Sequence, residues 1–256
     1  MFEHVAIDVV SGVGWLRFDR PRVNAFDRQM LDETEAAFDL LLANETARVI
    51  VLGSTNPKYF SAGADLETFR NISSEAIDDW VTTCHRLARR IRSGPKPVIA
   101  CIRGVAVGGG LEMSLHADRR FSARDAQLGQ PEVNIAFVPP VAGTQALVRL
   151  VGRSAALKIL YSGELIDAEE ALKIGLVDEI HDAGEIEATV QVFCEQLATK
   201  PPNALAAIRR CLADGGDTTF AEGMAMEAHE ACVLAEHPNF REGIEAFLNR
   251  RPPNWT

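Results

Sequence analysis

Residues 98–112, which read VIACIRGVAVGGGLE, constrain the fold of this chain more than any other stretch. The first five are β-branched or apolar, a pattern typical of a buried strand. Glycines follow at positions 104, 108, 109 and 110, and an apolar, helix-favouring run continues from Glu112. A strand, a glycine turn and a helix start bring free backbone N–H groups to one point, where negative charge is favoured. The stretch therefore predicts an anion-stabilising site with a carboxylate beside it.

Along the rest of the chain, the hydrophobic periodicity changes from mixed to purely helical. Strand patterns cover residues 5–10, 13–18, 48–53, 98–102, 119–123, 127–129 and 176–180. Helical patterns cover 27–43, 74–92, a segment from 112, 143–151, 155–161 and 168–174, and then 185–199, 202–213, 219–235 and 239–249. Because strand patterns end near residue 185, we expect an α/β core over residues 1–185 and an α-helical region over residues 186–256.

Composition excludes several classes of function. The chain has 256 residues, of which 47% are hydrophobic and 24% charged, as in ordinary globular proteins. Its net charge of −10 disfavours a nucleic-acid partner. The sequence contains neither a signal-peptide pattern nor the ~20 apolar residues of a membrane span, so we expect a cytoplasmic protein without membrane association. The five cysteines and six histidines lack metal-ligand spacing, which predicts no metal site.

A second glycine-containing loop, FSAGADL, occupies residues 60–66. Gly63 lies between two alanines, and such small residues let a ligand or another backbone approach closely. In a functional interpretation, Ala64 directs its N–H at a ligand oxygen. By itself, the motif fits a tight turn before a helix better. The glycines at 104, 108 and 110 do not have the spacing of the dinucleotide-binding fingerprint.

Two glutamates follow the glycine stretch, Glu112 in apolar surroundings and Glu132 after Gln-Pro. Either one alone is more typical of a solvated surface residue. As a pair beside an anion site, they would act as general acid and base, with pKa values raised by burial. His116, on the same predicted helix as Glu112, is interpreted as a packed or hydrogen-bonded residue. Arg22 and Arg250 fit a phosphate contact and an ordinary solvated surface equally well.

Taken together, these motifs resemble the enoyl-CoA hydratase/isomerase family, also called the crotonase superfamily. The resemblance spans essentially the whole chain, in the family's order. It rests on RPRVNAFD (20–27), FSAGADL (60–66), PVIACIRGVAVGGGLEMSLHAD (97–118), AQLGQPEVNI (126–135), AGTQALVRLVG (142–152), SGELIDAEEALKIGLVDEI (162–180) and REGIEAFLNRRPPNW (241–255). The resemblance implies an α/β fold, a spiral of ββα units whose C-terminal helices form trimers, often paired into hexamers.

The resemblance also implies an acyl-coenzyme A thioester as ligand, with no metal or redox cofactor, since coenzyme A is part of the substrate. The N–H groups of Ala64 and Gly109 would form an oxyanion hole. Glu112 would activate water, and Glu132 would deliver a proton to the α-carbon. Further positions match residues that line the acyl-coenzyme A in the family: Arg22, Val23, Ala25, Ala62, Asp65, Leu66, Pro140, Phe247 and Arg250.

The chain departs from the family pattern after the second glutamate. A glycine-rich PGAGG turn is usual there, whereas this chain has Pro139-Pro140-Val141-Ala142-Gly143. Pro140 replaces a glycine whose N–H helps to hold the reacting water, and Ala136 replaces another common glycine. We expect a trans-2-enoyl-CoA hydratase, because both glutamates are present. Another crotonase-type reaction (isomerisation, hydrolysis or decarboxylation) and a non-catalytic acyl-CoA-binding protein are the alternatives.

Overall fold

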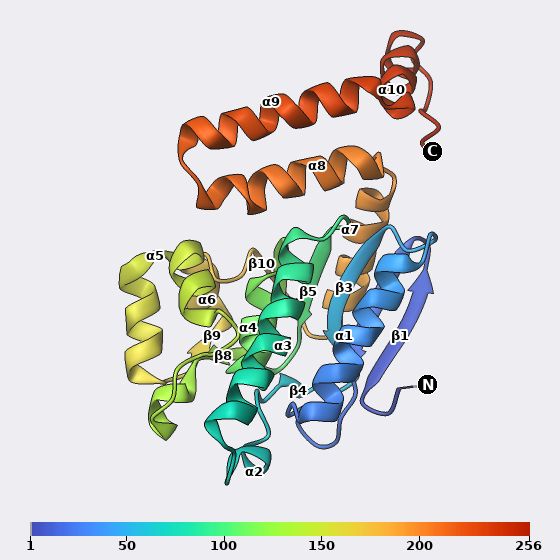
Figure 1. Ribbon diagram of the computed structural model, residues 1–256. Helices are drawn as coiled ribbons and strands as arrows, with labels where there is room; N and C mark the ends of the chain where they lie inside the picture. Colours follow the sequence, from blue (N-terminus) through green and yellow to red (C-terminus); the bar gives the residue numbers. More distant parts are fainter. Residues whose placement is uncertain (1) are drawn as a thin grey trace.

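The computed structural model describes residues 2–256 and contains two β-sheets surrounded by helices (Figure 1). The larger sheet has six strands in the order β1-β2-β3-β5-β7-β10. Strands β1 and β2 pair antiparallel, and the remaining neighbours pair parallel. Its strands are β1 (Val5–Val10), β2 (Val13–Phe18), β3 (Val49–Ser54), β5 (Val98–Ile102), β7 (Arg119–Ala123) and β10 (Glu179–His181).

The smaller sheet has the order β4-β6-β8-β9. Its strands are β4 (Tyr59–Ser61), β6 (Val105–Val107), β8 (Gln127–Gly129) and β9 (Ile166–Asp167). Strands β3, β5 and β7 of the large sheet are each followed by one strand of the small sheet and then by helical structure. This repeat of two strands and a helix is the predicted α/β spiral. It brings the segments that follow β4, β6 and β8 to one side of the small sheet.

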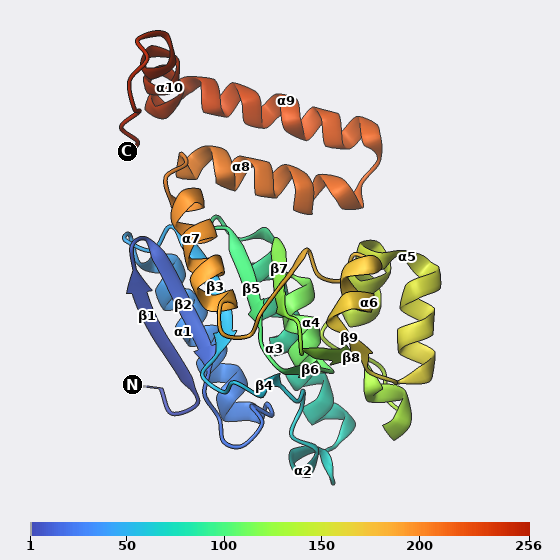
Figure 2. The same ribbon diagram turned by 180° about the vertical axis from the view of Figure 1, so that it is seen from behind.

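Helices cover both faces of the large sheet (Figures 1 and 2). Helices α1 and α3 lie on one face and α7 on the other, while α8, α9 and α10 form a separate layer beyond the sheet. The helices are α1 (Arg28–Ala43), α2 (Leu66–Phe69), α3 (Ser74–Ser93), α4 (Gly109–Leu115), α5 (Gly143–Ser162), α6 (Ala168–Lys173), α7 (Ile186–Ala198), α8 (Pro202–Ala213), α9 (Phe220–Glu236) and α10 (Pro238–Leu248), with 3₁₀ turns η1 (Pro131–Ile135) and η2 (Gly215–Asp217).

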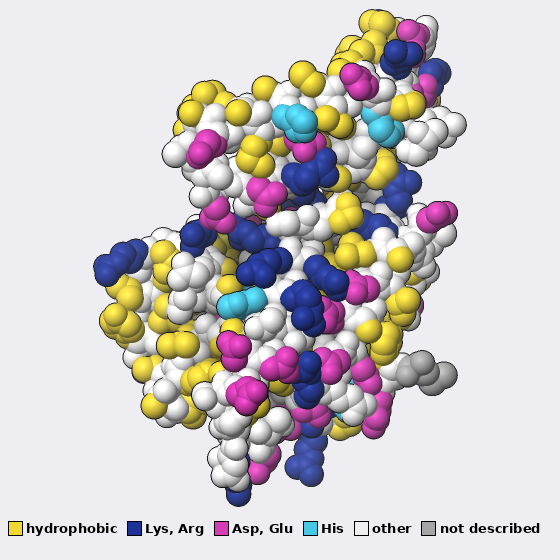
Figure 3. All heavy atoms as spheres, viewed as in Figure 1, with side chains coloured by type: hydrophobic (Ala, Val, Ile, Leu, Met, Phe, Trp, Pro, Cys, Tyr) yellow, Lys and Arg dark blue, Asp and Glu magenta, His cyan; other side chains and the backbone are white. Residues whose placement is uncertain are grey.

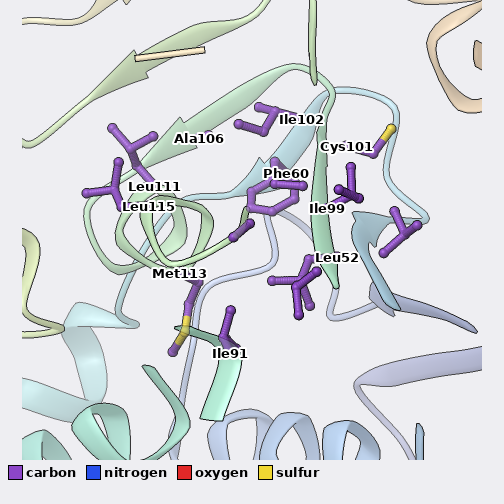
Figure 4. Close-up of a cluster of buried hydrophobic side chains, with 14 of the residues drawn as sticks. Leu52, Phe60, Ile91, Ile99, Cys101, Ile102, Ala106, Leu111, Met113 and Leu115 are labelled. Carbon is purple, nitrogen blue, oxygen red and sulfur yellow. The ribbon is translucent and has the colours of Figure 1, made fainter. Parts of the chain in front are cut away.

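The hydrophobic core lies between the sheets and the helices α1, α3 and α4. Phe60 of β4 packs edge-to-face on Phe18 of β2, with ring centroids 5.2 Å apart. Aromatic pairs in this geometry gain about 1 kcal/mol beyond their buried area. Figure 4 shows Phe60 among the aliphatic side chains of β5 and α4, including Ile99 and Leu111. Strand β4, which leads into the loop at 61–66, is thus packed on both sides.

Charged side chains of both signs alternate on the outer face formed by α1 and α3 (Figure 3). Arg86 and Arg90 of α3 bind Glu35 and Asp39 of α1. These two basic side chains are therefore paired with acidic ones across the two helices. Within residues 2–256, no helix is long and apolar enough to cross a membrane.

Several predicted elements differ from the structure. The strand predicted over 176–180 is β10 at Glu179–His181, because the N–H groups of Leu176 and Val177 bond to Ala171 and close α6 instead. The helices predicted over 143–151 and 155–161 lie within α5, interrupted at Gly152 with φ +77°. The helix predicted from Glu112 begins at Gly109. Glu132, predicted in a loop, lies in a 3₁₀ turn.

The boundary predicted at residue 185 falls between β10 and α7, where strands end. Helix α7, however, packs on β2, β3, β5 and β7 of the core sheet. The layer that stands apart in Figure 1 therefore consists of α8, α9 and α10. Helix α9 contains no buried side chain within the single chain, and Phe220 at its start is 84% exposed.

Candidate active site

Two glycine-containing loops, 61–66 and 107–110, meet at one end of the small sheet. Gly63 has a φ of +81°, and a Cβ there would lie 3.0 Å from the carbonyl oxygen of Val107. Only a glycine allows the two backbones to approach this closely. The Oγ of Ser61 donates to the Asn24 carbonyl at 2.7 Å and accepts from the Gly63 N–H at 3.1 Å. The Ser61 contacts hold the shape of the first loop, and the close approach at Gly63 brings it against the second.

The N–H groups of Ala64 and Gly109 are both free in this arrangement. On either side of Ala64, the Gly63 carbonyl accepts from Phe26 at 2.7 Å and the Asp65 N–H donates to Phe26 at 2.8 Å. Gly109 is the first residue of α4, where an N–H has no partner within the helix. Within the described chain, neither N–H donates a hydrogen bond. Two adjacent donors are therefore available to one ligand oxygen.

Glu112 lies on α4 and is fully buried. Its Oε1 accepts hydrogen bonds from the N–H groups of Val141, at 2.7 Å, and Gly143, at 2.8 Å. Its Oε2 is buried and has no partner among residues 2–256. Burial raises the pKa of Glu112 to about 8, and the charge of Glu132 adds to this effect, whereas the two N–H contacts oppose it. One oxygen is thus anchored and the other is free to exchange a proton.

Glu132 lies on η1 and is 8% exposed. Its Oε1 faces Gly108, where a Cβ would approach it to 2.8 Å, so a side chain at 108 would displace this carboxyl. With its amide nitrogen facing the carboxyl, Gln130 donates to both oxygens of Glu132, at 3.0 and 3.2 Å. Burial raises the pKa of Glu132. The two buried carboxyls influence each other's ionisation, and they titrate as a pair.

A cleft of about 490 Å³ opens beside these groups. Ala64, Gly108, Glu132 and Pro140 line its inner end. The wall is apolar and comes from α2, α3 and η1, with Leu66, Phe69, Ile72, Ile77, Trp80, Ile135 and Phe137. A smaller recess of about 20 Å³ lies between Ala64, Gly109 and Pro140, and Trp80 lines both spaces. An apolar cleft with a few convergent polar groups is the usual form of a small-molecule site.

The structure brings five of the thirteen predicted site residues to this cleft, which are Ala62, Ala64, Leu66, Glu132 and Pro140. Gly109 lines the adjoining recess, and Glu112 lines neither space. Val23 accepts a hydrogen bond from Ala62 at 3.0 Å, next to the exposed Arg22. Further contacts tie this region together, because Arg20 pairs with Asp65 at 2.9 Å and bonds to the Ala25 carbonyl at 2.8 Å.

Phe247 and Arg250 are not brought to the cleft within the single chain. Phe247 lies on α10 in the helical layer, is 83% exposed, and borders an apolar hollow formed by α8, α9 and α10. In Figure 1, α10 lies at the opposite end of the molecule from α2. The predicted contact of Phe247 and Arg250 with acyl-coenzyme A would require a second copy of the chain, and stays a prediction.

The sequence motifs did not reveal the groups that surround the two glutamates. Gln130, which contacts Glu132, was only part of a motif, and His116 had no assigned partner. Trp80 and Cys84 lie in the segment 74–92, which is predicted as a helix, and both border the recess. Their helical spacing is the same for a packed side chain and for one that lines a pocket, so no pattern could separate the two.

Comparison with known proteins identifies the family of this chain. The sequence model of the enoyl-CoA hydratase/isomerase family matches residues 8–256. A probable enoyl-CoA hydratase of Bacillus subtilis is 33% identical over 98% of both chains. A probable mitochondrial enoyl-CoA hydratase of Arabidopsis thaliana is 35% identical over 96% of this chain and 82% of its own. The chain therefore belongs to the enoyl-CoA hydratase/isomerase family.

Solved structures support the same assignment. An enoyl-CoA hydratase structure from Geobacillus kaustophilus has a TM-score of 0.96 at 30% identity, and covers 100% of this chain and 97% of its own. One from Bacillus anthracis has a TM-score of 0.94 at 29% identity, with 99% of each chain covered. The predicted fold class, a crotonase-type α/β spiral, is confirmed by this agreement.

Proposed function

We propose that this protein hydrates trans-2-enoyl-CoA thioesters to 3-hydroxyacyl-CoA thioesters, and catalyses the reverse reaction. The observation that carries the proposal is the pair of buried carboxyls, Glu112 and Glu132, near two free N–H groups. Glu132 and Ala64 line the apolar cleft, and Gly109 lines the recess beside it. Hydration of an enoyl thioester needs a base, an acid and a site for a negative oxygen. Relatives of this chain that are named enoyl-CoA hydratases support the same reaction.

In the proposed mechanism, the thioester oxygen accepts hydrogen bonds from the N–H groups of Ala64 and Gly109. Ionised Glu112 removes a proton from water while the water oxygen bonds to C3. The electron pair of the double bond moves to the thioester oxygen, and the resulting enolate is held by the two N–H groups. Protonated Glu132 then gives its proton to C2, so that one water has been added.

The starting state needs one proton on the pair of carboxyls. Because burial raises the pKa of both groups, and the charge of Glu132 raises that of Glu112 further, the pair keeps a proton up to about pH 8. After hydration the proton has moved from Glu132 to Glu112. Return of this proton to Glu132 completes the cycle.

The remaining features of the proposal concern binding and assembly. The 5′ end of coenzyme A would lie near Arg22 and Val23, with Ala25, Ala62, Asp65 and Leu66 along its path. The reaction needs neither a metal nor a redox cofactor. We also propose a homotrimer or a dimer of trimers in the cytoplasm, in which Phe247 and Arg250 of one copy reach the nucleotide bound by another. The exposed apolar side chains of α9 and α10 favour such an assembly.

Loss of absorbance at the enoyl-thioester band tests the proposal directly. Purified protein is mixed with crotonyl-, octenoyl- and branched enoyl-CoAs, and the products are analysed after reaction in ¹⁸O-labelled water. We expect one solvent oxygen in the product and an intact thioester. Absence of turnover with every one of these substrates would contradict the proposal. The single variants Glu112→Gln and Glu132→Gln serve as controls for background hydration.

Pro140 favours a second candidate, another reaction of the same family on an acyl-CoA. Pro140 lies at the inner end of the cleft and has no N–H with which to hold the reacting water. An isomerase would move the double bond without adding oxygen, whereas a hydrolase would release free coenzyme A. The same product analysis separates these outcomes. Tight binding of acyl-CoA without any turnover would instead identify a binding protein.

A further inference from the structure

His116 is a buried residue that the proposed mechanism does not use. It is the residue at which α4 ends, four positions after Glu112, and is 5% exposed. Its Nε2 lies 2.8 Å from the carbonyl oxygen of Val141. Because a carbonyl oxygen only accepts, Nε2 carries the hydrogen in this contact. The imidazole therefore donates a hydrogen bond to the turn 139–143.

The same turn supplies the two N–H groups that bind Glu112. The Val141 N–H and the Gly143 N–H both point to Oε1 of that carboxyl, at 2.7 and 2.8 Å. Helix α4 thus holds the turn at two points one helical turn apart. Glu112 accepts hydrogen bonds from two N–H groups of the turn, and His116 donates a hydrogen bond to the carbonyl that lies between them.

The turn needs such support because its backbone is strained. Ala142 has a φ of +60°, a left-handed conformation that is unfavourable for a residue with a Cβ. A strained conformation persists only where surrounding contacts hold it. The carbonyl that His116 binds belongs to the peptide unit between Val141 and Ala142, and the two N–H groups that bind Glu112 belong to the peptide units on either side of it. A displacement of the middle unit would break the His116 contact and shift both of its neighbours. The imidazole is placed where it opposes that displacement.

The ring has no other polar contact within the described chain. Its Nδ1 is buried and has no hydrogen-bond partner among residues 2–256. Burial lowers the pKa of His116 to about 4, and His85, Arg92 and Arg120 lie near enough to add to this effect, while the Val141 carbonyl opposes it. The imidazole is thus neutral at the pH of catalysis, with its one hydrogen on Nε2.

We propose that His116 is a positioning residue: its imidazole fixes the turn 139–143, and that turn orients the carboxyl of Glu112. This inference deepens the proposed hydratase function, on which its kinetic test rests. Loss of the imidazole contact lets the turn move and weakens the two hydrogen bonds to Oε1. Since these bonds favour the ionised carboxyl, their loss leaves Glu112 harder to ionise. The charge of Glu132 on η1 also raises the pKa of Glu112, and Glu112 in turn raises the pKa of the Cys84 thiol on α3.

The kinetic test compares variants that keep or remove the donor. His116→Leu removes it, and His116→Gln keeps an N–H donor of similar reach. We expect His116→Leu to lose about 10- to 100-fold in kcat with little change in KM, as small misplacements of catalytic groups do. We expect the alkaline limb of the pH–rate profile of His116→Leu to move to higher pH. His116→Gln should restore most of the wild-type kcat and most of the wild-type pH dependence. His181→Leu is the matched control, because its Nε2 contacts Glu179 on β10 instead, and its kinetics stay unchanged.

A second measurement needs no turnover. Carbon-13 NMR of the labelled glutamate carboxyls, assigned with Glu112→Gln, follows the titration of Glu112 in the substrate-free protein. We expect its midpoint to lie higher in His116→Leu than in the wild type. If the wild type hydrates no enoyl-CoA, the proposed function fails and this titration still decides the role of His116. His116→Met replaces the leucine variant if the latter does not fold.

Two outcomes would overturn the inference. The first is a His116→Leu variant that keeps the kcat and the Glu112 titration of the wild type, because the imidazole would then play no part in positioning the site. The second is an equal loss of kcat in His116→Leu and His116→Gln with an unchanged titration of Glu112, which would mean that His116 acts by packing alone.

Discussion

Replacement of Glu112 by glutamine tests the claim that its carboxyl is buried at a cost to stability. The amide oxygen of Glu112→Gln still accepts from the N–H groups of Val141 and Gly143, and the side chain keeps its volume. Only the titration is removed. In the folded protein the pKa of Glu112 is about 8, raised by burial from a reference value of 4.5. Because the folded-state pKa is the higher one, its contribution to stability is complete below pH 4.5 and is lost as the pH rises through 8.

The magnitude follows from this interval. Each pH unit between the unfolded-state and folded-state pKa values changes stability by about 1.4 kcal/mol. From pH 5 to pH 9, about three of these units are crossed. The wild type therefore loses about 4 kcal/mol relative to Glu112→Gln, which is a large share of the 5–15 kcal/mol typical of a folded domain.

Urea unfolding of both proteins, at several pH values between 5 and 9, measures this difference. We expect similar stabilities at pH 5 and a clearly more stable glutamine variant at pH 9, while catalysis in that variant is lost. A stability difference that does not change between pH 5 and pH 9 would refute the reasoning, because the carboxyl would then titrate alike in the folded and unfolded chain.

Four further predictions concern the site and its scaffold. Glu132→Gln should lower kcat by about 10²- to 10⁴-fold with little effect on KM in steady-state assays, the loss of a general acid; an unchanged kcat would remove this residue from the mechanism. Hydration should fall above about pH 8 in a pH–rate profile, because the pair of carboxyls then loses the proton that C2 receives; a rate that still rises there would contradict the assignment. Pro140→Gly restores an N–H for the reacting water and should raise kcat about tenfold, whereas a slower variant would show that the proline shapes the site productively. Gly104→Ala should destabilise the fold by about 2 kcal/mol more than Gly175→Ala in denaturant unfolding. Both glycines have a positive φ, but only a Cβ at position 104 would clash with backbone, 2.1 Å from the Lys58 carbonyl oxygen. Equal losses of stability in the two variants would contradict this clash.

The parts of the site that sequence could predict are those with a local pattern. The strand at 98–102, the glycines after it and the apolar run at Glu112 lie within one short segment, and each follows from residue type alone. Elements with weak local signals were missed or misplaced. Strands β6 and β9 have three and two residues, too few for a period to show, and they form because neighbouring strands already present an edge.

Contacts between distant segments account for most of what the sequence did not reveal. The free N–H of Ala64 depends on Phe26 holding the residues on either side of it. The two N–H groups on Glu112 come from a turn about 30 residues further along the chain. Neither relationship leaves a periodic trace. The resemblance to a family predicted the Ala64 N–H as a donor, whereas the contacts of the Val141 and Gly143 N–H groups with Glu112 were found only in the structure.

The replacement of glycines near Glu132 shows how the fold tolerates a departure from the family pattern. Ala136 has a φ of +55°, and Ala142 has a φ of +60°, so both alanines adopt the left-handed conformation in which glycine is usual. Each such residue costs roughly 1 kcal/mol relative to glycine. The backbone therefore keeps its shape while its freedom to move is reduced, since alanine has fewer alternatives than glycine. Together with Pro139 and Pro140, these residues make the segment that carries the Val141 and Gly143 N–H groups stiffer than a glycine-rich turn. Together with the His116 contact, this stiffness keeps the two groups on Glu112 even though the turn offers no N–H at position 140. The departure therefore removes one N–H but not the support of the carboxyl that we propose as the base.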